Sequence, residues 1–272
     1  MSRKFHFTRD TMKRLKDFAA NREENAAPAE PLTAALEEYG LTHVGKVRAS
    51  NQDVLIEADE LRLYGVADGM GGHNGGETAS AGARDTLIGF LQDRKPSLDA
   101  LRSAFEKANA DLFHQQENDE KLSGMGTTLS AVWFSDDFVY LGHVGDSRVY
   151  RLRDGEFQQL TDDHSLVGEL VRAGFLTPEQ AENHPNKNVI TRAVGTEEGI
   201  EVDLAVEERR PGDIWMICSD GLHGMVKADL LEQLIRKHEP KKAAELLMEA
   251  ALENGGRDNI SVVILRDGEV AQ

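Results

Sequence analysis

The chain has 272 residues, of which 40% are hydrophobic and 29% are charged, and its formal net charge at pH 7 is −17. This length and balance are typical of one large globular domain or two small ones, and they exclude an intrinsically disordered protein. A chain this acidic would repel the phosphates of nucleic acid, so we expect no nucleic acid partner. The sequence contains no apolar run of membrane-spanning length and no secretory signal, so we expect a cytoplasmic protein.

Residues 1–33 differ in composition from the rest of the chain. Residues 1–16 contain six Lys or Arg and one Asp, and Met12, Leu15 and Phe18 recur at the three-residue spacing of one helix face. The remainder of the segment is polar and contains prolines, which is typical of a linker. We therefore expect a basic N-terminal extension and linker. It is either a helix that docks on an acidic partner or membrane surface, or a mobile tail, and the composition favours the tail.

From residue 34 onward the pattern is that of a folded domain, which we place at residues 34–268. Six short runs rich in β-branched and aromatic residues predict strands, at 63–67, 128–134, 138–144, 149–152, 213–218 and 260–265. Two pairs of amphipathic segments predict helices, at 76–90, 97–116, 227–237 and 241–253. Short polar connections such as Asp154-Gly155 favour antiparallel hairpins. The predicted fold class is α+β, a four-layer α-β-β-α sandwich of two antiparallel sheets flanked by helical pairs.

Two residues with reactive side chains lie inside predicted strands. Cys218 is the single cysteine of the chain, which excludes a disulfide framework and a cysteine-based metal site. We expect it to be a buried small hydrophobic residue and not a nucleophile. We likewise interpret His143 as a packing residue.

Four aspartates lie at the ends of predicted strands, each beside a glycine or an asparagine. They are Asp68, Asp146, Asp220 and Asp258. Any one of them alone is better explained as ordinary turn chemistry, but four together indicate carboxylates that a rigid scaffold presents at one site. Carboxylate ligands without a His or Cys set select hard divalent cations, so the pattern predicts Mg²⁺ or Mn²⁺.

Taken in order, the motifs of residues 40–266 resemble the bacterial branch of the protein phosphatase type 2C family, the metal-dependent serine/threonine phosphatases. The segments that carry the resemblance are Val47–Asp53, Val66–His73, Gly76-Glu77, Gly126–Thr128, Val144–Arg148, Asp163–Leu166, Asn188–Arg192, Cys218–Leu222 and Gly256–Ile260. The fold of that family, a β-sandwich flanked by helices, agrees with the layering predicted from the pattern.

The resemblance implies a set of metal ligands. Asp68 would bridge two ions, and Gly69 would offer its backbone carbonyl to one of them. Asp220 and Asp258 would complete the shell of the first ion. Asp146 would share a third ion with Asp220. The implied cofactor is Mn²⁺ or Mg²⁺, two or three ions.

The resemblance also implies residues that act around the ions, and it has two departures. Arg48 would bind the substrate phosphate through paired hydrogen bonds, although it could also be an ordinary surface arginine. Asp53 would hydrogen-bond a metal-bound water. Gln52 stands where many members have an acidic residue. Met70 stands where eukaryotic members have a proposed general acid, and we expect His73 to be a structural loop residue and not its replacement.

The implied activity is hydrolysis of phosphoserine and phosphothreonine by a metal-activated water at a dinuclear Mg²⁺ or Mn²⁺ centre, without a covalent intermediate. The implied partners are phosphorylated substrates of a serine/threonine kinase, and we expect a monomer. A polar stretch at about 161–199, with a capping box at Thr177–Gln180, resembles the family's flap and would influence substrate choice. Two alternatives are a catalytically silent relative and a phosphoesterase for small molecules.

Overall fold

The computed structural model describes residues 36–71 and 75–268. The expected N-terminal extension and His73 lie outside these residues. In the described part of the chain, eleven strands form two sheets, and every strand pairing is antiparallel.

The strand orders show which strands lie at the edges. The first sheet has the order β1 (Leu36–His43), β11 (Ile260–Asp267), β10 (Ile214–Cys218), β7 (Arg148–Arg153) and β8 (Glu156–Gln159). The second has the order β2 (Asp53–Ala58), β3 (Leu63–Met70), β5 (Leu129–Phe134), β6 (Phe138–Val144) and β9 (Asp203–Glu208), with the short β4 (Gly126–Thr127) beside β3.

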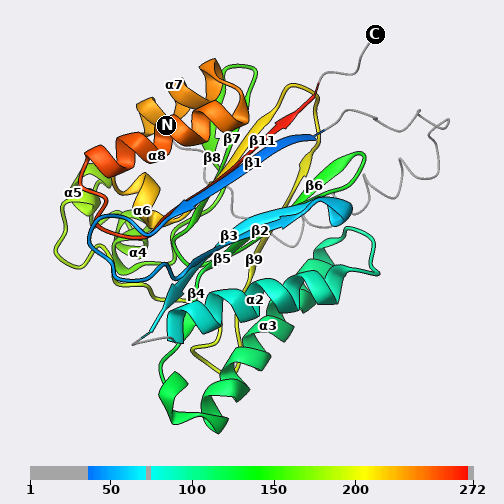
Figure 1. The fold of residues 1–272 in the computed structure, drawn as a ribbon, viewed down its shortest axis with the longest axis vertical. Helices are drawn as coiled ribbons and strands as arrows, with labels where there is room; N and C mark the ends of the chain where they lie inside the picture. Colours follow the sequence, from blue (N-terminus) through cyan, green and yellow to red (C-terminus); the bar gives the residue numbers. More distant parts are fainter. Residues whose placement is uncertain (1–35, 72–74, 269–272) are drawn as a thin grey trace. The chain divides into compact units, whose positions relative to one another are not determined.

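Helices cover the outer face of each sheet, as Figure 1 shows. The second sheet is covered by α2 (Gly75–Leu91) and α3 (Leu98–Asn118), and the first by α7 (Ala228–Lys237) and α8 (Pro240–Glu253). Shorter helical segments are η1 (Asp59–Leu61), η2 (Glu120–Leu122), α4 (Leu166–Arg172), α5 (Pro178–Glu182) and α6 (Asp220–His223). The predicted α-β-β-α sandwich and its four long helices are therefore confirmed. None of the helices in the described residues has the length and apolar character that crossing a membrane requires.

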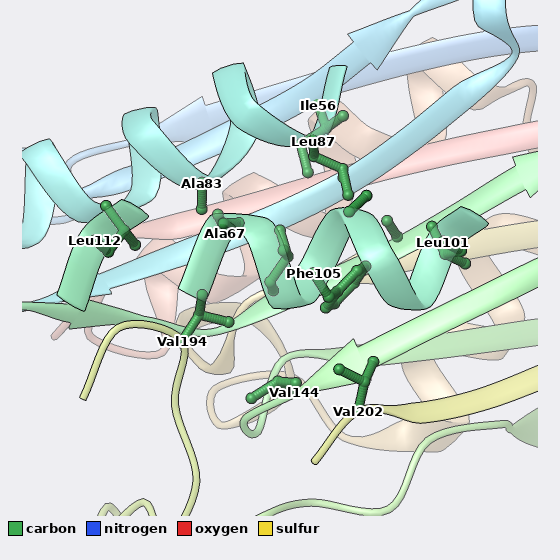
Figure 2. Packing of buried hydrophobic residues seen from close by; sticks show 14 of the residues in the cluster. Ile56, Ala67, Ala83, Leu87, Leu101, Phe105, Leu112, Val144, Val194 and Val202 are labelled. Carbon is green, nitrogen blue, oxygen red and sulfur yellow. The ribbon is translucent and has the colours of Figure 1, made fainter. Parts of the chain in front are cut away.

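Three apolar layers hold the four structural layers together. Between the sheets, Phe134 and Trp215 meet edge to face with ring centroids 5.8 Å apart. Between the second sheet and its helices, Leu87 of α2 and Phe105 of α3 are buried against the strands (Figure 2). A third cluster, which includes Leu247 of α8, fills the space between the first sheet and its helices. Because these three apolar layers are closely packed, the sheets and helices form a rigid support for the loops that connect them.

The sequence prediction located the interior strands and did not locate the edges. All six predicted strands are present, with ends that differ by a few residues. Four of the five unpredicted strands, β1, β2, β8 and β9, are the outermost strands of the two sheets, and the fifth is the two-residue β4. An edge strand packs on fewer neighbours and tolerates charged residues, as Glu37 and Glu38 in β1 illustrate. The apolar signal is therefore weakest where the sheet ends.

Replacing Phe105 by Ala tests the layer between α3 and the second sheet. Its ring is fully buried and lies close to Gly142, where an added Cβ would be 2.7 Å from Phe105 Cε2. We expect a loss of about 3–5 kcal/mol in the free energy of unfolding, measured by urea denaturation. The matched control is Phe175→Ala, because Phe175 is 76% exposed, and it should change stability by less than about 0.5 kcal/mol. Equal losses in the two variants would contradict this packing.

Candidate active site

The strand register brings the ends of several strands to one end of the sandwich. In the second sheet, Asp68 near the end of β3 lies opposite Asp53 at the start of β2. In the first sheet, Cys218 at the end of β10 lies opposite Arg148 at the start of β7. It also lies opposite Val262 near the start of β11. The loops that carry the predicted aspartates leave the sheets at these positions.

The aspartates at this end are close enough for their charges to interact. Burial raises the pKa of Asp68 well above its usual value, and the further causes are the charges of four other aspartates, Asp53, Asp220, Asp146 and Asp258. Burial, followed by the charge of Asp146, raises the pKa of Asp220 to about 8. Burial also raises the pKa of Asp146 to about 7 and that of Asp53 to about 6. The structure therefore brings together all five aspartates that the sequence analysis singled out.

The donor set fits hard divalent cations. Asp53 Oδ1 and Asp146 Oδ1 are buried and have no hydrogen-bond partner in the described part of the chain. Several buried carboxylates in one place, two with unsatisfied oxygens, are what Mg²⁺ or Mn²⁺ would satisfy. Within residues 36–71 and 75–268, no three His, Cys, Asp or Glu side chains are placed so that they could hold a metal ion by themselves. Asp258 Oδ2 is paired with Arg48 Nη2 at 2.7 Å. Water would supply further ligands, as these ions commonly require.

The backbone of Asp68 is held by two threonines. The Asp68 amide donates to Thr128 Oγ1 over 3.0 Å, and Thr127 Oγ1 donates to the Asp68 carbonyl over 3.0 Å. The next residue, Gly69, donates its amide to Gln52 O over 3.1 Å. A Cβ on Gly69 would lie 2.0 Å from Gly76 O. Only glycine therefore allows the start of α2 to approach β3 this closely.

Asp146 lies in the turn between β6 and β7, where the base of the predicted flap holds it. The Gly145 amide donates to His164 Nδ1 over 3.0 Å, and the His164 amide donates to Gly145 O over 2.8 Å. Arg148 donates to both carboxylate oxygens of Asp163, with Nη2 to Oδ2 at 2.7 Å. The flap base and the turn are therefore linked by paired contacts and by an ion pair.

The predicted flap contains two short helices. They are α4 and α5, and α5 begins with the capping box predicted at Thr177–Gln180. Isolated bridges join Ser165 to Ile190 and Thr127 to Val194. The second bridge places Val194 beside Thr127, which donates a hydrogen bond to the Asp68 carbonyl. Residues at both ends of the flap are thus tied to the same end of the sandwich.

Arg48 lies on a loop that one buried side chain closes. Asn259 Nδ2 donates to Val44 O over 3.0 Å and to Ser50 O over 2.9 Å. Its Oδ1 accepts the Gln52 amide over 2.8 Å. The side chain amide of Asn259 therefore has three partners that span residues 44–52, and it directly follows Asp258 in the chain. The Arg48 side chain itself is 55% exposed.

Asp53 is supported by two serines. Ser219 Oγ donates to Asp53 Oδ2 over 2.8 Å and accepts the Ser261 amide over 3.0 Å. Asp53 on β2 is therefore bound to the segment after β10 and, through Ser219, linked to the start of β11. Its position connects the two sheets at the site.

Cys218 and His143 are both fully buried. Burial raises the pKa of the Cys218 thiol to about 12, so it stays protonated, as expected of a packing residue. His143 does more than pack, because Nε2 donates to Asp162 O over 3.1 Å and Nδ1 lies 2.8 Å from Ser130 Oγ. Burial lowers the pKa of His143 to about 4.

Several supporting residues lie in the sequence motifs, but no individual role was predicted for them. They are Thr128, Arg148, Asp163, His164 and Asn259. Their presence in ordered motifs was a signal, but their hydrogen-bond partners lie far away in the sequence. His223, whose Nε2 lies 3.0 Å from Asp146 O, was not predicted, although it directly follows the motif segment Cys218–Leu222. Composition and periodicity carry no information about hydrogen bonds between residues that are distant in the sequence.

Comparison with known proteins identifies the family. A model of the Protein phosphatase 2C family matches residues 40–254. The chain belongs to the protein phosphatase 2C family. The matched part is therefore a domain of this family, in agreement with the resemblance of its motifs.

Two curated relatives show the extent of the similarity. The serine/threonine protein phosphatase PstP of Mycobacterium tuberculosis is 41% identical over 223 residues, which are 81% of this chain and 43% of that protein. The chain thus spans less than half of the length of PstP. The serine/threonine phosphatase stp of Listeria monocytogenes is 37% identical over 234 residues, which are 82% of this chain and 93% of that protein.

Solved structures show the same fold. A crystal structure of M. tuberculosis PstP matches with a TM-score of 0.81 at 38% identity, and it covers 86% of this chain and 99% of that one. The catalytic domain of PstP in complex with two manganese ions matches with a TM-score of 0.80 at 37% identity, and it covers 87% of this chain and 100% of that one. The β-sandwich described above is thus the fold of this family.

Replacing Asp220 by Asn tests the crowding of the carboxylates. The pKa of Asp220 is about 8 in the folded protein against an ordinary 3.8. Unfolding in EDTA therefore releases a proton above about pH 4, and stability falls as pH rises towards 8. The uncharged amide of the variant avoids this loss, so we expect the stability of Asp220→Asn relative to the unchanged protein to increase from pH 5 to pH 8. Urea denaturation in EDTA measures it. The exposed Asp136→Asn is the control, and a difference that does not grow with pH would contradict the prediction.

Replacing Asn259 by Ala tests the closure of the Arg48 loop. The variant loses all three side chain hydrogen bonds, and it leaves backbone groups of residues 44–52 without their partner. We expect hydrogen exchange in this loop to accelerate about tenfold or more, corresponding to a loss of about 1–3 kcal/mol of local stability. Exchange in α7 and α8 serves as the internal control. Equal acceleration everywhere would indicate global destabilisation instead.

Proposed function

We propose that this chain is a phosphoprotein phosphatase that hydrolyses phosphoserine and phosphothreonine at a centre of two or three Mn²⁺ or Mg²⁺ ions. The observation that carries the proposal is the gathering of five aspartates from separate strands and loops at one end of the family's sandwich. The manganese-bound PstP domain, whose fold this chain shares, supports the choice of cofactor.

The charge interactions among the aspartates support a different role for each proposed ligand. Asp68 is the proposed bridging ligand because the charges of the other four aspartates all act on it. Gly69 would add its backbone carbonyl, and Asp258 would complete the first ion's shell. Asp220 is the proposed shared ligand, because Asp146 and Asp258 are the largest charge contributions to its pKa. Asp146 would hold the third ion with it.

When bound, such cations lower the pKa of a coordinated water and neutralise charge on the phosphoryl oxygens. The protein's own residues would orient the substrate around them. Arg48 would donate paired hydrogen bonds to the phosphate, for which its exposed guanidinium next to Asp258 is well placed. Asp53 Oδ1 is buried and lacks a hydrogen-bond partner among the described residues, so it is available to accept a hydrogen bond from a water of the site.

The remaining parts of the proposal concern partners and location. The substrates would be products of a serine/threonine kinase, and the phosphatase would act as a monomer in cytoplasmic signalling. Residues 161–199 would form the flap of a phosphatase domain at 34–268. The basic residues 1–33 would be an extension that either docks on an acidic partner or stays mobile.

The test of the proposed function is phosphate release from a phosphothreonine peptide by the purified chain. We expect turnover with Mn²⁺, none in EDTA, and a loss of about 10²-fold or more in Asp68→Ala, because the change removes several kcal/mol of transition-state stabilisation. The control is Asp136→Ala, since Asp136 is 58% exposed and pairs with Arg62.

Each alternative predicts a different result. Absence of Mn²⁺-dependent turnover would overturn the enzyme assignment and favour a silent relative. Turnover of small phosphate esters alone, with none on the peptide, would favour a small-molecule phosphoesterase. Truncation of residues 1–33 tests the docking role, because that role predicts lost partner binding with unchanged peptide turnover.

A further inference from the structure

The turn that carries Asp146 receives a further hydrogen bond, separate from the flap contacts. His223 Nε2 lies 3.0 Å from the Asp146 carbonyl oxygen. A carbonyl oxygen can only accept, so Nε2 carries the proton and donates it. The bond goes to the backbone of Asp146, and it leaves both carboxylate oxygens of that residue out of the contact.

His223 belongs to the short helix that begins at Asp220. The helix α6 spans Asp220–His223, and its turn is closed by the Gly224 amide, which donates to Asp220 O over 2.8 Å. Three residues are nearly one turn of a helix, so the position of His223 is fixed relative to that of Asp220. Through this bond the helix that begins with one proposed ligand holds the backbone of another.

The β-ladder alone does not fix the distance between the two aspartates. The pairing of β10 with β7 ends at Cys218 and Arg148. Each aspartate lies two residues beyond this last pair. Asp146 is in the turn before β7, and Asp220 is the first residue of α6. The His223 bond joins the two segments again beyond the end of the ladder.

The carboxylates that this bond keeps in place are neighbours. After burial, the charge of Asp146 is the largest cause of the raised pKa of Asp220. Asp146 is 6% exposed, and its Oδ1 has no hydrogen-bond partner among the described residues. A small change in the separation of these two side chains would therefore alter any ion they share, because ligand geometry sets affinity.

We propose that His223 is a positioning residue that sets the separation of Asp146 and Asp220, and thereby the affinity of the ion that these two share. This inference rests on the proposed function, because it requires Asp146 to be a metal ligand. It assigns His223 no contact with substrate or with an ion. Its effect is confined to one of the proposed ion sites.

The test compares Mn²⁺ binding to full-length variants by isothermal titration calorimetry, with the stoichiometry checked by equilibrium dialysis. His223→Phe keeps a ring but removes the donor, and we expect it to weaken the weakest class of Mn²⁺ sites about tenfold. The tighter sites should keep their affinities. His223→Gln retains an N–H donor and should restore most of the loss. His114→Phe on the surface of α3 is the control, because its side chain is 68% exposed.

Asp146→Asn separates the inference from the function on which it rests. It should abolish the weakest class, and the double variant with His223→Phe should bind like Asp146→Asn alone, because both changes act on one site. Equal weakening of all sites, or binding by His223→Phe that matches the unchanged protein, would overturn the role of His223. Retention of every ion by Asp146→Asn would overturn the shared ion and the inference with it. Unchanged tight binding in Asp68→Ala would instead overturn the proposed function itself.

Discussion

Mutual repulsion of buried carboxylates is the constraint on which the organisation of this end of the sandwich depends. Five aspartates meet here, burial raises the pKa of four of them, and the negative charges oppose one another. Divalent cations reverse the balance, because they turn the repelling oxygens into ligands. The electrostatic free energy that disfavours the site without ions therefore favours the binding of divalent cations to it. Metal binding and folding are linked as a result.

Such a site needs a scaffold that resists the repulsion. The two sheets supply it through strand ladders, but the aspartates stand at or beyond the ends of those ladders. Hydroxyl, amide and imidazole side chains continue the support where the ladders stop, as Thr128 does for Asp68 and Asn259 for the Arg48 loop. The polar residues around the site thus replace sheet hydrogen bonding at the point where the chain has to turn.

The sequence predicted the parts of the molecule whose signals are local. Interior strands such as β5 and β11 consist mostly of apolar residues, and the Asp-Gly pairs near strand ends are visible without a structure. The edge strands were missed because β1 and β9 carry acidic residues and are only half-buried. At the site the sequence located the carboxylates, while the resemblance to a family supplied their proposed roles. The hydrogen bonds of Asn259 and His223 join residues whose separation in the chain no local pattern encodes.

The burial of Cys218 has a consequence for the reaction of the protein with oxidants. Its thiol lies two residues before Asp220, yet it is fully buried and has a pKa of about 12. Oxidants and alkylating agents attack the thiolate, which is scarcely populated under these conditions. A phosphatase that works through cysteine loses its nucleophile to peroxide, whereas here the single thiol of the chain is kept unreactive beside the proposed metal ligands. Under the proposed function, oxidation of this thiol would therefore not remove a catalytic group from the domain.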